Sequence, residues 1–135
     1  MVKSAQLAKQ IVVTIANKVG ILAEISKLVA DHGINVEAVA GYAINNEAKI
    51  MFLTSDNQRV TDALKKAGYS SIKEEEVVVV ELENKAGALK NITGVLVDQG
   101  IDIKQVYGTA CIAGCPAKII LSTSNNDKVL VALKK

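Results

Sequence analysis

The spacing of apolar residues changes several times along the chain, and each change marks a predicted element. A short β-branched run predicts a strand, and apolar residues at helical spacing follow it. Apolar residues at a period of two then begin at Ile34, and Asn45-Asn46 is typical of a hairpin turn that leads into a third strand. A second amphipathic helix completes the first half of the chain. The predicted elements are a strand at residues 11–16, a helix from Ile21 to its end at Gly33, a strand from Ile34, a strand at residues 49–54, and a helix capped by Ser55 or Asp56.

The second half of the chain repeats the first. Residues 11–43 align with residues 78–110 at a constant offset of 67, and residues 48–66 align with residues 117–135 at an offset of 69. The additional residues lie in the second copy, around the sequence CIAGCP. Repetition on this scale predicts two copies of one small structural unit. The predicted units are residues 1–67 and residues 68–135.

Each copy is expected to fold as a ferredoxin-like βαββαβ unit. Two interleaved strand–helix–strand crossovers produce a four-stranded antiparallel sheet with two helices on one face. The chain is thus predicted to be an α+β protein of two tandem units, each with its own sheet. Residues 70–76 supply the closing strand of the first copy. The second copy has no matching segment after its second helix. We therefore predict that residues 1–9 cross over and complete its sheet through residues 3–9; the alternative is a frayed N-terminus beside an open three-stranded sheet.

The predicted strands carry apolar residues on both faces. Val12 and Val13 are consecutive in the first strand, as are Val78, Val79 and Val80 in the matching strand of the second copy. Consecutive apolar residues in a strand indicate burial on both sides, whereas the predicted helices cover only one side. We therefore expect the copies to pack on each other or on another chain, with a homodimer as the expected assembly.

The amino-acid composition argues against several classes of function. The chain has 135 residues, half of them apolar, with a net charge of +2 and only four aromatic residues. This apolar share argues against disorder, and no stretch approaches the roughly 20 apolar residues of a membrane-spanning helix. Scattered lysines and few aromatic rings argue against nucleic-acid binding, and a polar N-terminus unlike a signal peptide predicts a cytoplasmic protein. His32 is the single histidine, which disfavours a histidine-based metal or proton-relay site.

Two cysteines, Cys111 and Cys115, flank the residues inserted in the second copy. Their C-x3-C spacing differs from the C-x2-C spacing of zinc ribbons, and no second pair completes four ligands, so we predict no metal site. The favoured interpretation is two small apolar side chains in a hairpin, with a thiol pair close enough to form a disulfide as the alternative. An enzyme built on these cysteines would lack a base, an acid and a third group.

The two copies resemble a known family. Each copy has a strand followed by N-K-[VA]-G-x-L, an apolar-faced helix and D-x-G-I-[ND]-[VI], and this combination resembles the ACT domain. The resemblance spans nearly the whole chain as a tandem pair. It implies a ferredoxin-like, non-catalytic regulatory module, without a cofactor, that binds a small molecule, most often an amino acid. Val19 and Ala86 stand where the family more often has proline.

The candidate ligand site lies where the first strand of each copy meets its helix. Gly20 and Gly87 stand at helix N-termini, whose unpaired amides favour an anion such as an amino-acid carboxylate. Asn17 and Asn84 offer both donors and acceptors, and a turn or cap without a ligand is an equally open role for them. The resemblance implies that the loop of one domain faces the second strand of its partner. The predicted ligand-binding residues are Asn17, Val19, Gly20, Ile21, Leu22, Asn35, Asn84, Ala86, Gly87, Ala88, Leu89 and Asp102.

Two functions remain open on these observations. The first is a regulatory module that binds a small amino acid at an interface between ACT domains. It would transmit occupancy to a partner, such as a separate enzyme of amino-acid metabolism. The second is a structural oligomerisation module that binds no ligand. A screen of amino acids for thermal stabilisation separates the two.

Overall fold

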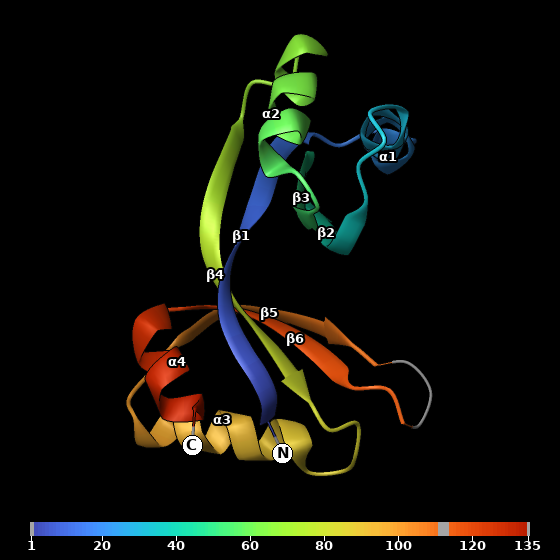
Figure 1. Cartoon of the computed structure of the whole chain (residues 1–135). Coiled ribbons are helices and arrows are strands. Elements are labelled where there is room, and N and C mark those ends of the chain that lie inside the picture. Colours follow the sequence, from blue (N-terminus) through green and yellow to red (C-terminus); the bar gives the residue numbers. More distant parts are fainter. Residues whose placement is uncertain (1, 111–113, 135) are drawn as a thin grey trace. The chain divides into compact units, whose positions relative to one another are not determined.

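The computed structural model describes residues 2–110 and 114–134 (Figure 1). Both halves of the chain show the predicted order of strand, helix, strand, strand and helix, which confirms the α+β class. The first half contains β1 (Val2–Ala16), α1 (Ile21–Asp31), β2 (Val36–Ile44), β3 (Glu47–Thr54) and α2 (Asn57–Lys66). The second half contains β4 (Ile72–Leu82), α3 (Ala88–Asp98), β5 (Ile103–Thr109), β6 (Ala117–Thr123) and α4 (Asn126–Leu133).

The strands form one six-stranded sheet in the order β2-β3-β1-β4-β6-β5. The prediction of two separate four-stranded sheets is therefore wrong. The reason is the length of two strands, since β1 has 15 residues and β4 has 11, whereas a typical strand has about 5 or 6. In β4, the predicted closing strand of the first copy continues without a break into the first strand of the second copy.

The chain divides into two compact units that share these long strands. The first unit is Lys9–Glu75, and the second unit comprises the described residues up to Ala8 together with those from Glu76 onward. In the N-terminal part of β1, Val2 and Ala5 pack against the core of the second unit. Each unit thus combines a segment of β1 and a segment of β4 with two shorter strands and two helices.

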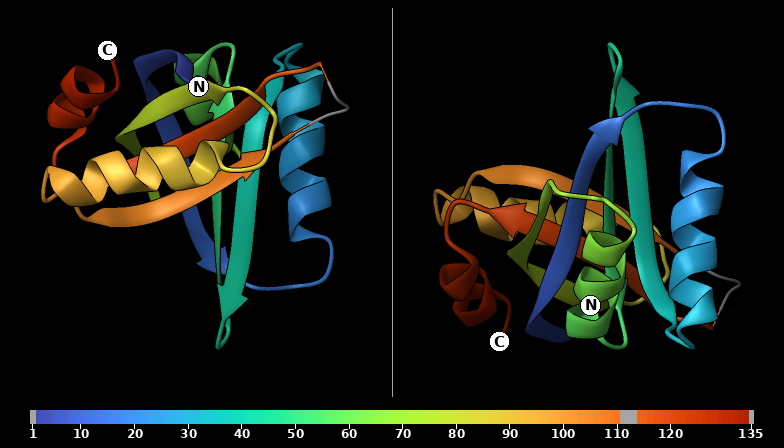
Figure 2. Two further views of the ribbon diagram at one scale, coloured as in Figure 1. Left: turned by 90° about the horizontal axis from the view of Figure 1, so that it is seen from below. Right: turned by 90° about the horizontal axis from the view of Figure 1, so that it is seen from above.

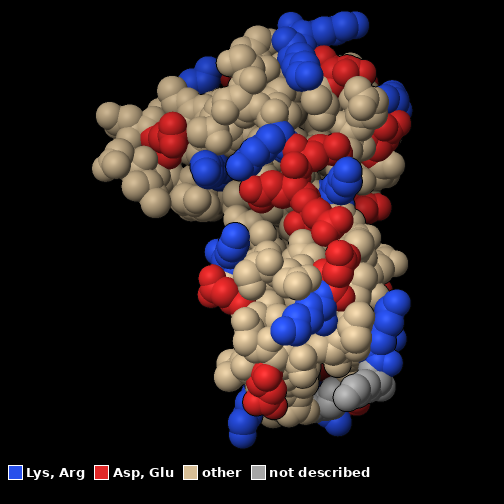
Figure 3. Space-filling view, turned by 90° about the vertical axis from the view of Figure 1, so that its left-hand side faces the viewer, with Lys and Arg blue, Asp and Glu red and all other residues tan. Residues whose placement is uncertain are grey.

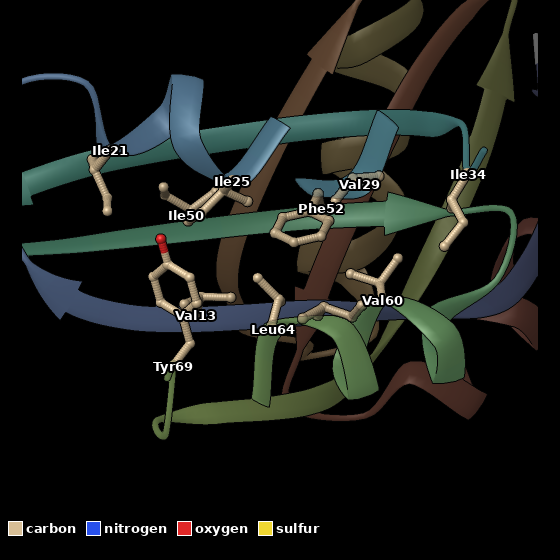
Figure 4. Close-up of a cluster of buried hydrophobic side chains, with 11 residues drawn as sticks. Val13, Ile21, Ile25, Val29, Ile34, Ile50, Phe52, Val60, Leu64 and Tyr69 are labelled. Carbon is tan, nitrogen blue, oxygen red and sulfur yellow. The ribbon is translucent and has the colours of Figure 1, made fainter. Parts of the chain in front are cut away.

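The core of the first unit lies between its strands and the helices α1 and α2 (Figure 4). Alternate residues of β1 and β3 point toward the helices, with Ile11 opposite Phe52 and Val13 opposite Ile50. Burying one such side chain contributes about 1.5–3 kcal/mol to folding. The buried members are Ile11, Val13, Ile21, Ile25, Val29, Ile34, Ile50, Phe52, Val60, Leu64 and Tyr69.

The second unit builds its core from the matching elements. Val78 and Val80 of β4 face Leu121 and Ile119 of β6 in an antiparallel register. Helices α3 and α4 contribute their apolar faces to the same cluster. The buried members are Val78, Val80, Leu82, Ala88, Ile92, Leu96, Ile101, Leu121, Val129 and Leu133.

Side-chain hydrogen bonds at the starts of α2 and α4 repeat from one unit to the other. Asn57 donates from Nδ2 to the Lys9 carbonyl (2.9 Å), and Asn126 donates from Nδ2 to the Glu76 carbonyl (3.0 Å). These bonds tie the first residue of each helix to the long strand beside it. The repeated asparagines therefore have a structural role that needs no ligand.

Basic side chains cap the first helix of each unit in the same way. Arg59 donates from Nη2 to the His32 carbonyl (2.7 Å) at the end of α1, and Lys128 donates from Nζ to the Gln99 carbonyl (2.9 Å) at the end of α3. A cation at the C-terminal end of a helix is favoured because free carbonyls and the helix dipole place partial negative charge there. The repeat is thus maintained at the level of single hydrogen bonds.

Gly41 in β2 and Gly108 in β5 occupy matching positions of the repeat but differ in crowding. A Cβ atom on Gly108 would lie 2.7 Å from the Lys118 carbonyl oxygen and would also collide with the Ile119 side chain. A Cβ atom on Gly41 would have the Lys49 carbonyl oxygen as its nearest neighbour, at 3.4 Å. The close approach of two strands therefore requires glycine at position 108 but not at position 41.

We expect Gly108→Ala to lower the free energy of unfolding by roughly 1–3 kcal/mol, because backbone atoms of the neighbouring strand must move. Gly41→Ala, the matched control, is expected to cost less, because its nearest neighbour needs to shift by only a few tenths of an ångström. Urea unfolding followed by circular dichroism measures both values. Equal losses in the two variants would contradict the difference in strand spacing.

Charged side chains of both signs are interspersed on the surface. Figure 3 shows Lys and Arg side chains lying among Asp and Glu side chains on one face. Exposed ion pairs such as Lys27–Asp31 (2.7 Å) and Lys73–Glu75 (3.2 Å) occur within single elements. Solvent screens such pairs, so they add little to stability. No helix in the described part of the chain is long and apolar enough to cross a membrane.

Candidate functional site

The loop at residues 17–20 joins β1 to α1 and ends in a conformation that favours glycine. Gly20 is the N-cap of α1 with φ 87° and ψ 3°, and no side chain caps the helix. Gly87 caps α3 in the same way, with φ 88°. The first α-helical hydrogen bond of α1 runs from the Glu24 amide to the Gly20 carbonyl (2.9 Å). The amides of Leu22 and Ala23 precede this bond and stand at the positive end of the helix dipole.

A cavity of about 320 Å³ opens beside this loop. Asn17 from the loop, with Ile21 and Leu22 from the first turn of α1, forms one wall. The facing wall belongs to β2, and both views in Figure 2 show α1 running alongside that strand. Apart from the Asn17 amide and the Tyr42 hydroxyl, the lining side chains are apolar. The strand residues that line the cavity are Val39, Ala40, Gly41, Tyr42 and Ala43 of β2, with Ala48 and Ile50 of β3.

A second apolar hollow, of about 230 Å³, lies between α1 and β2. It shares Leu22, Val39 and Ile50 with the cavity beside the loop. Leu22 and Val39 are 53% and 52% exposed, so the two hollows open onto apolar surface. A contiguous exposed apolar surface of this kind is typical of a site that binds a ligand or a partner.

The cavity brings together three of the residues predicted for the first copy, namely Asn17, Ile21 and Leu22. Val19 is fully exposed. Asn35 precedes β2 and does not line this cavity. Its amide donates to the Ser55 hydroxyl (3.1 Å), and its carbonyl accepts a hydrogen bond from the Ser55 amide (3.0 Å).

The predicted residues of the second copy lie in different surroundings. Ala88 is buried in the core, whereas Leu89 is half exposed and Ala86 and Gly87 are exposed. Asn84 lines a cavity of about 250 Å³ that is polar rather than apolar. The residues around that cavity are Lys3, Glu83, Asn84, Lys85, Gly114, Cys115 and Pro116.

Asp102 repeats the contacts of Asn35 at the matching position of the second copy. Its amide donates to the Ser124 hydroxyl (3.0 Å), and its carbonyl accepts from the Ser124 amide (2.9 Å). A serine that precedes the second helix of each unit therefore fixes the main chain at both positions. Ligand contacts from the side chains of Asn35 and Asp102 stay a prediction.

Lys18 and Glu24 carry the charge beside the first loop, and the Tyr69 hydroxyl contacts Glu24. Lys18 Nζ lies 3.3 Å from one carboxylate oxygen of Glu24, and the Tyr69 hydroxyl donates to the other. The hydrogen bond from Tyr69, and then the Lys18 ammonium, hold the pKa of Glu24 below its ordinary value. Burial, and then the neighbouring carboxylate, raise the pKa of Tyr69 to about 12. At neutral pH Glu24 is therefore charged and Tyr69 keeps its proton.

Of the two cysteines, Cys111 lies outside the described residues. Cys115 lines the polar cavity beside Asn84. A thiol pair of Cys111 and Cys115 stays the alternative to two small apolar side chains. Among residues 2–110 and 114–134, no group of three or more His, Cys, Asp or Glu side chains could hold a metal ion.

Sequence reasoning missed the β2 wall of the cavity. These residues are small and apolar, so they carry no chemical signal of a binding site. The repeat does contain a weaker signal, because VAGYA at residues 39–43 matches VYGTA at residues 106–110. Val39, Gly41 and Ala43 are identical to their counterparts at an offset of 67. All three line the cavity in the first copy.

Comparison with known proteins is consistent with this architecture. The sequence profile of the ACT domain matches residues 9–68, which contain the loop and the cavity. Comparison with curated protein sequences finds no match.

Several solved structures share the fold over nearly the whole chain. Protein BT0572 from Bacteroides thetaiotaomicron is similar with a TM-score of 0.88 and 28% identity, over 96% of this chain and 88% of that chain. The ligand-free regulatory subunit of aspartate kinase from Thermus thermophilus has a TM-score of 0.68 and 16% identity, over 97% of this chain and 95% of that chain. Aspartokinase III of E. coli in complex with aspartate and ADP has a TM-score of 0.59 and 16% identity, over 99% of this chain but 34% of that chain.

Proposed function

We propose that this chain, in which residues 9–68 are an ACT domain, is a regulatory module that binds a small amino acid at the loop between β1 and α1. The cavity beside Asn17, Ile21 and Leu22 carries the proposal. The repeated N-K-x-G motif and the cavity point independently to the same loop. A volume of about 320 Å³ lies at the lower end of the range for small-molecule sites, about 300–1,000 Å³, and so suits a small ligand.

The chemistry of the cavity favours a zwitterion with a small apolar side chain. Its carboxylate would accept hydrogen bonds from the amides of Leu22 and Ala23 at the start of α1. The side-chain oxygen of Asn17 would accept a hydrogen bond from its ammonium group. An apolar side chain would contact Val39 and Ile50, which line the cavity.

Proteins of similar fold support a regulatory role. A regulatory subunit of aspartate kinase and an aspartokinase bound to aspartate and ADP both share this architecture, at 16% identity. We propose by analogy that the chain has no catalytic activity of its own. It would report ligand occupancy to a separate enzyme of amino-acid metabolism.

A second copy of the chain is the proposed cover for the exposed side of the cavity. Leu22, Val39 and Tyr42 line the cavity and are each about half exposed. A homodimer that buried them would place the ligand close to the interface between two ACT domains. Ligand binding would then change the affinity of the dimer, because a ligand shifts any equilibrium in which one state binds it better.

The alternative function is an oligomerisation module that binds no ligand. Strand β2 is an edge strand of the sheet and exposes Val36, Val39, Tyr42 and Ile44. The same apolar surface could be buried in a dimer with an empty cavity. Dimer formation alone therefore does not distinguish the two functions.

A thermal-shift screen against the twenty common amino acids tests the proposal. We expect one or a few small apolar amino acids to raise the Tm. At a concentration of 100 times the Kd, binding adds about 2.7 kcal/mol to stability. The N-acetylated form of the same amino acid, which lacks the ammonium charge, is the matched control and should give a smaller rise. A flat response to all twenty would favour the oligomerisation module.

A further inference from the structure

A chain of three side chains connects the core of the first unit to the loop of the proposed site. Tyr69 follows α2, and its ring is buried in the core with 9% of its surface exposed. Figure 4 shows the ring among the core side chains, with its hydroxyl directed toward the start of α1 near Ile21. That hydroxyl donates to Glu24, whose second carboxylate oxygen pairs with Lys18 in the loop.

We propose that Tyr69 is a positioning residue for the ligand site. Through Glu24 it holds Lys18, and with it the loop, in the conformation in which Asn17 and Ile21 line the cavity. The ligand contacts are those of the proposed function, on which this part of the inference rests. The positioning of the loop itself does not depend on the identity of any ligand.

The anchors of the loop explain why this contact matters. At its start, the Asn17 amide donates to the Asn46 carbonyl (2.8 Å) in the hairpin turn between β2 and β3. At its end, the Ile21 amide donates to the Lys18 carbonyl, but the bond is long, at 3.3 Å. The exposed ion pair of Lys18 with Glu24 is weak by itself. The hydrogen bond from the buried Tyr69 fixes the Glu24 carboxylate that Lys18 contacts, and this combination gives the loop a second anchor.

The second copy lacks this arrangement. The residue that matches Glu24 is Asn91. Lys85, which matches Lys18, instead pairs with Glu83 at 3.3 Å, on the side of the preceding strand. The two loops share the same glycine cap but are held by different contacts. The geometry thus assigns the tyrosine-held loop to the first unit, beside the apolar cavity.

Tyr69→Phe in the full chain tests the proposal, because it removes the hydroxyl and keeps the buried ring. We expect hydrogen exchange at the amides of residues 17–23 to become about three- to tenfold faster, the effect of losing one hydrogen bond. Exchange at core amides of β3 should change less. The pKa of Glu24, followed by carboxyl NMR, should rise because its largest stabilising contact is gone.

Ligand binding is measured on the same variant with the amino acid that stabilises the wild-type protein most. We expect its affinity to fall about three- to tenfold, in line with the loss of order in the loop. Tyr107→Phe is the matched control, because Tyr107 lies in β5 of the second unit and burial raises its pKa to about 12 as well. That variant should leave exchange at residues 17–23 and ligand affinity unchanged.

Glu24→Gln is the second variant, because the half-exposed side chain of Glu24 can change without disturbing the core. It keeps an acceptor for Tyr69 and loses the charge that holds Lys18, so it should also speed exchange in the loop. Unchanged hydrogen exchange at the amides of residues 17–23 in both folded variants would overturn the proposal. Faster hydrogen exchange at these amides with unaltered ligand affinity would also overturn it. If the wild-type protein binds none of the amino acids, the proposed function fails, and faster loop exchange still supports the positioning of the loop by Tyr69.

Discussion

Replacing Ala43 by leucine is expected to weaken amino-acid binding strongly while the fold stays intact. Ala43 lines the cavity and pairs with Ala48 of β3, which in turn pairs with Ile15 of β1. Ile15 packs against the core under the helices, so Ala43 lies on the same face of the sheet as α1. A leucine there places a branched side chain in the space where the ligand's own side chain would lie. We expect binding to weaken about 100-fold or more, a loss of about 2.7 kcal/mol.

The repeat provides a control for this substitution. Ala110 occupies the matching position in the second copy, at an offset of 67, and lies outside the cavity. Ala110→Leu should keep the full thermal shift with the stabilising amino acid. Ala43 is exposed, so both variants without ligand should stay within about 0.5 kcal/mol of the wild-type stability. A wild-type Kd in Ala43→Leu would show that the amino acid binds elsewhere.

The elements of the fold could be predicted because each leaves a local pattern. The helices follow from apolar spacing, and the glycines at positions 20 and 87 mark their starts, where the structure places both in the left-handed region. The single sheet could not be predicted in the same way. Periodicity shows that residues 70–76 and the valines after them are extended, but it does not show where one sheet ends and another begins. In the structure the segment from Ile72 to Leu82 is one strand, β4.

Some residues of the candidate site could likewise be predicted from the sequence, and others could not. Asn17, Ile21 and Leu22 could be found because they lie next to a repeated motif with polar and glycine residues. The wall formed by Val39 and Ala43 could not, since apolar residues in a predicted strand are expected for any core. A cavity depends on how α1 and β2 are spaced in three dimensions, and that spacing has no signature along the chain.

The contact of Tyr69 with Glu24 was also beyond sequence reasoning. The two residues are separated by 45 positions, and neither belongs to a repeated pair. Tyr69 lies beyond the aligned part of the first copy, and Glu24 is replaced by Asn91 in the second. A comparison of the copies finds what they share, whereas this contact is a difference between them. Differences between copies are therefore a useful guide to features that belong to one site.

Phe52→Ala is expected to cost the first unit about 3–5 kcal/mol, the usual loss when a buried aromatic ring is removed from a core. Phe52 is the only phenylalanine of the chain and is 2% exposed. It lies opposite Ile11 in the sheet, and Figure 4 shows its ring between side chains of α1 and side chains of α2. Neighbouring side chains cannot fill the space of a ring without leaving their own contacts. Urea unfolding gives the loss, which is a large part of the about 5–15 kcal/mol that stabilises a typical domain.

A matching substitution at Leu121 tests whether the effect of Phe52→Ala is confined to the first unit. Leu121 matches Phe52 at an offset of 69 and is 1% exposed in the core of the second unit. Leu121→Ala should cost about 2–5 kcal/mol, with its largest loss of amide protection in α3 and β6. Phe52→Ala should instead lose most protection in α1 and β3. The same pattern of lost protection in both variants would mean that the long strands β1 and β4 couple the two cores into one cooperative unit, because a local loss of packing would then unfold both.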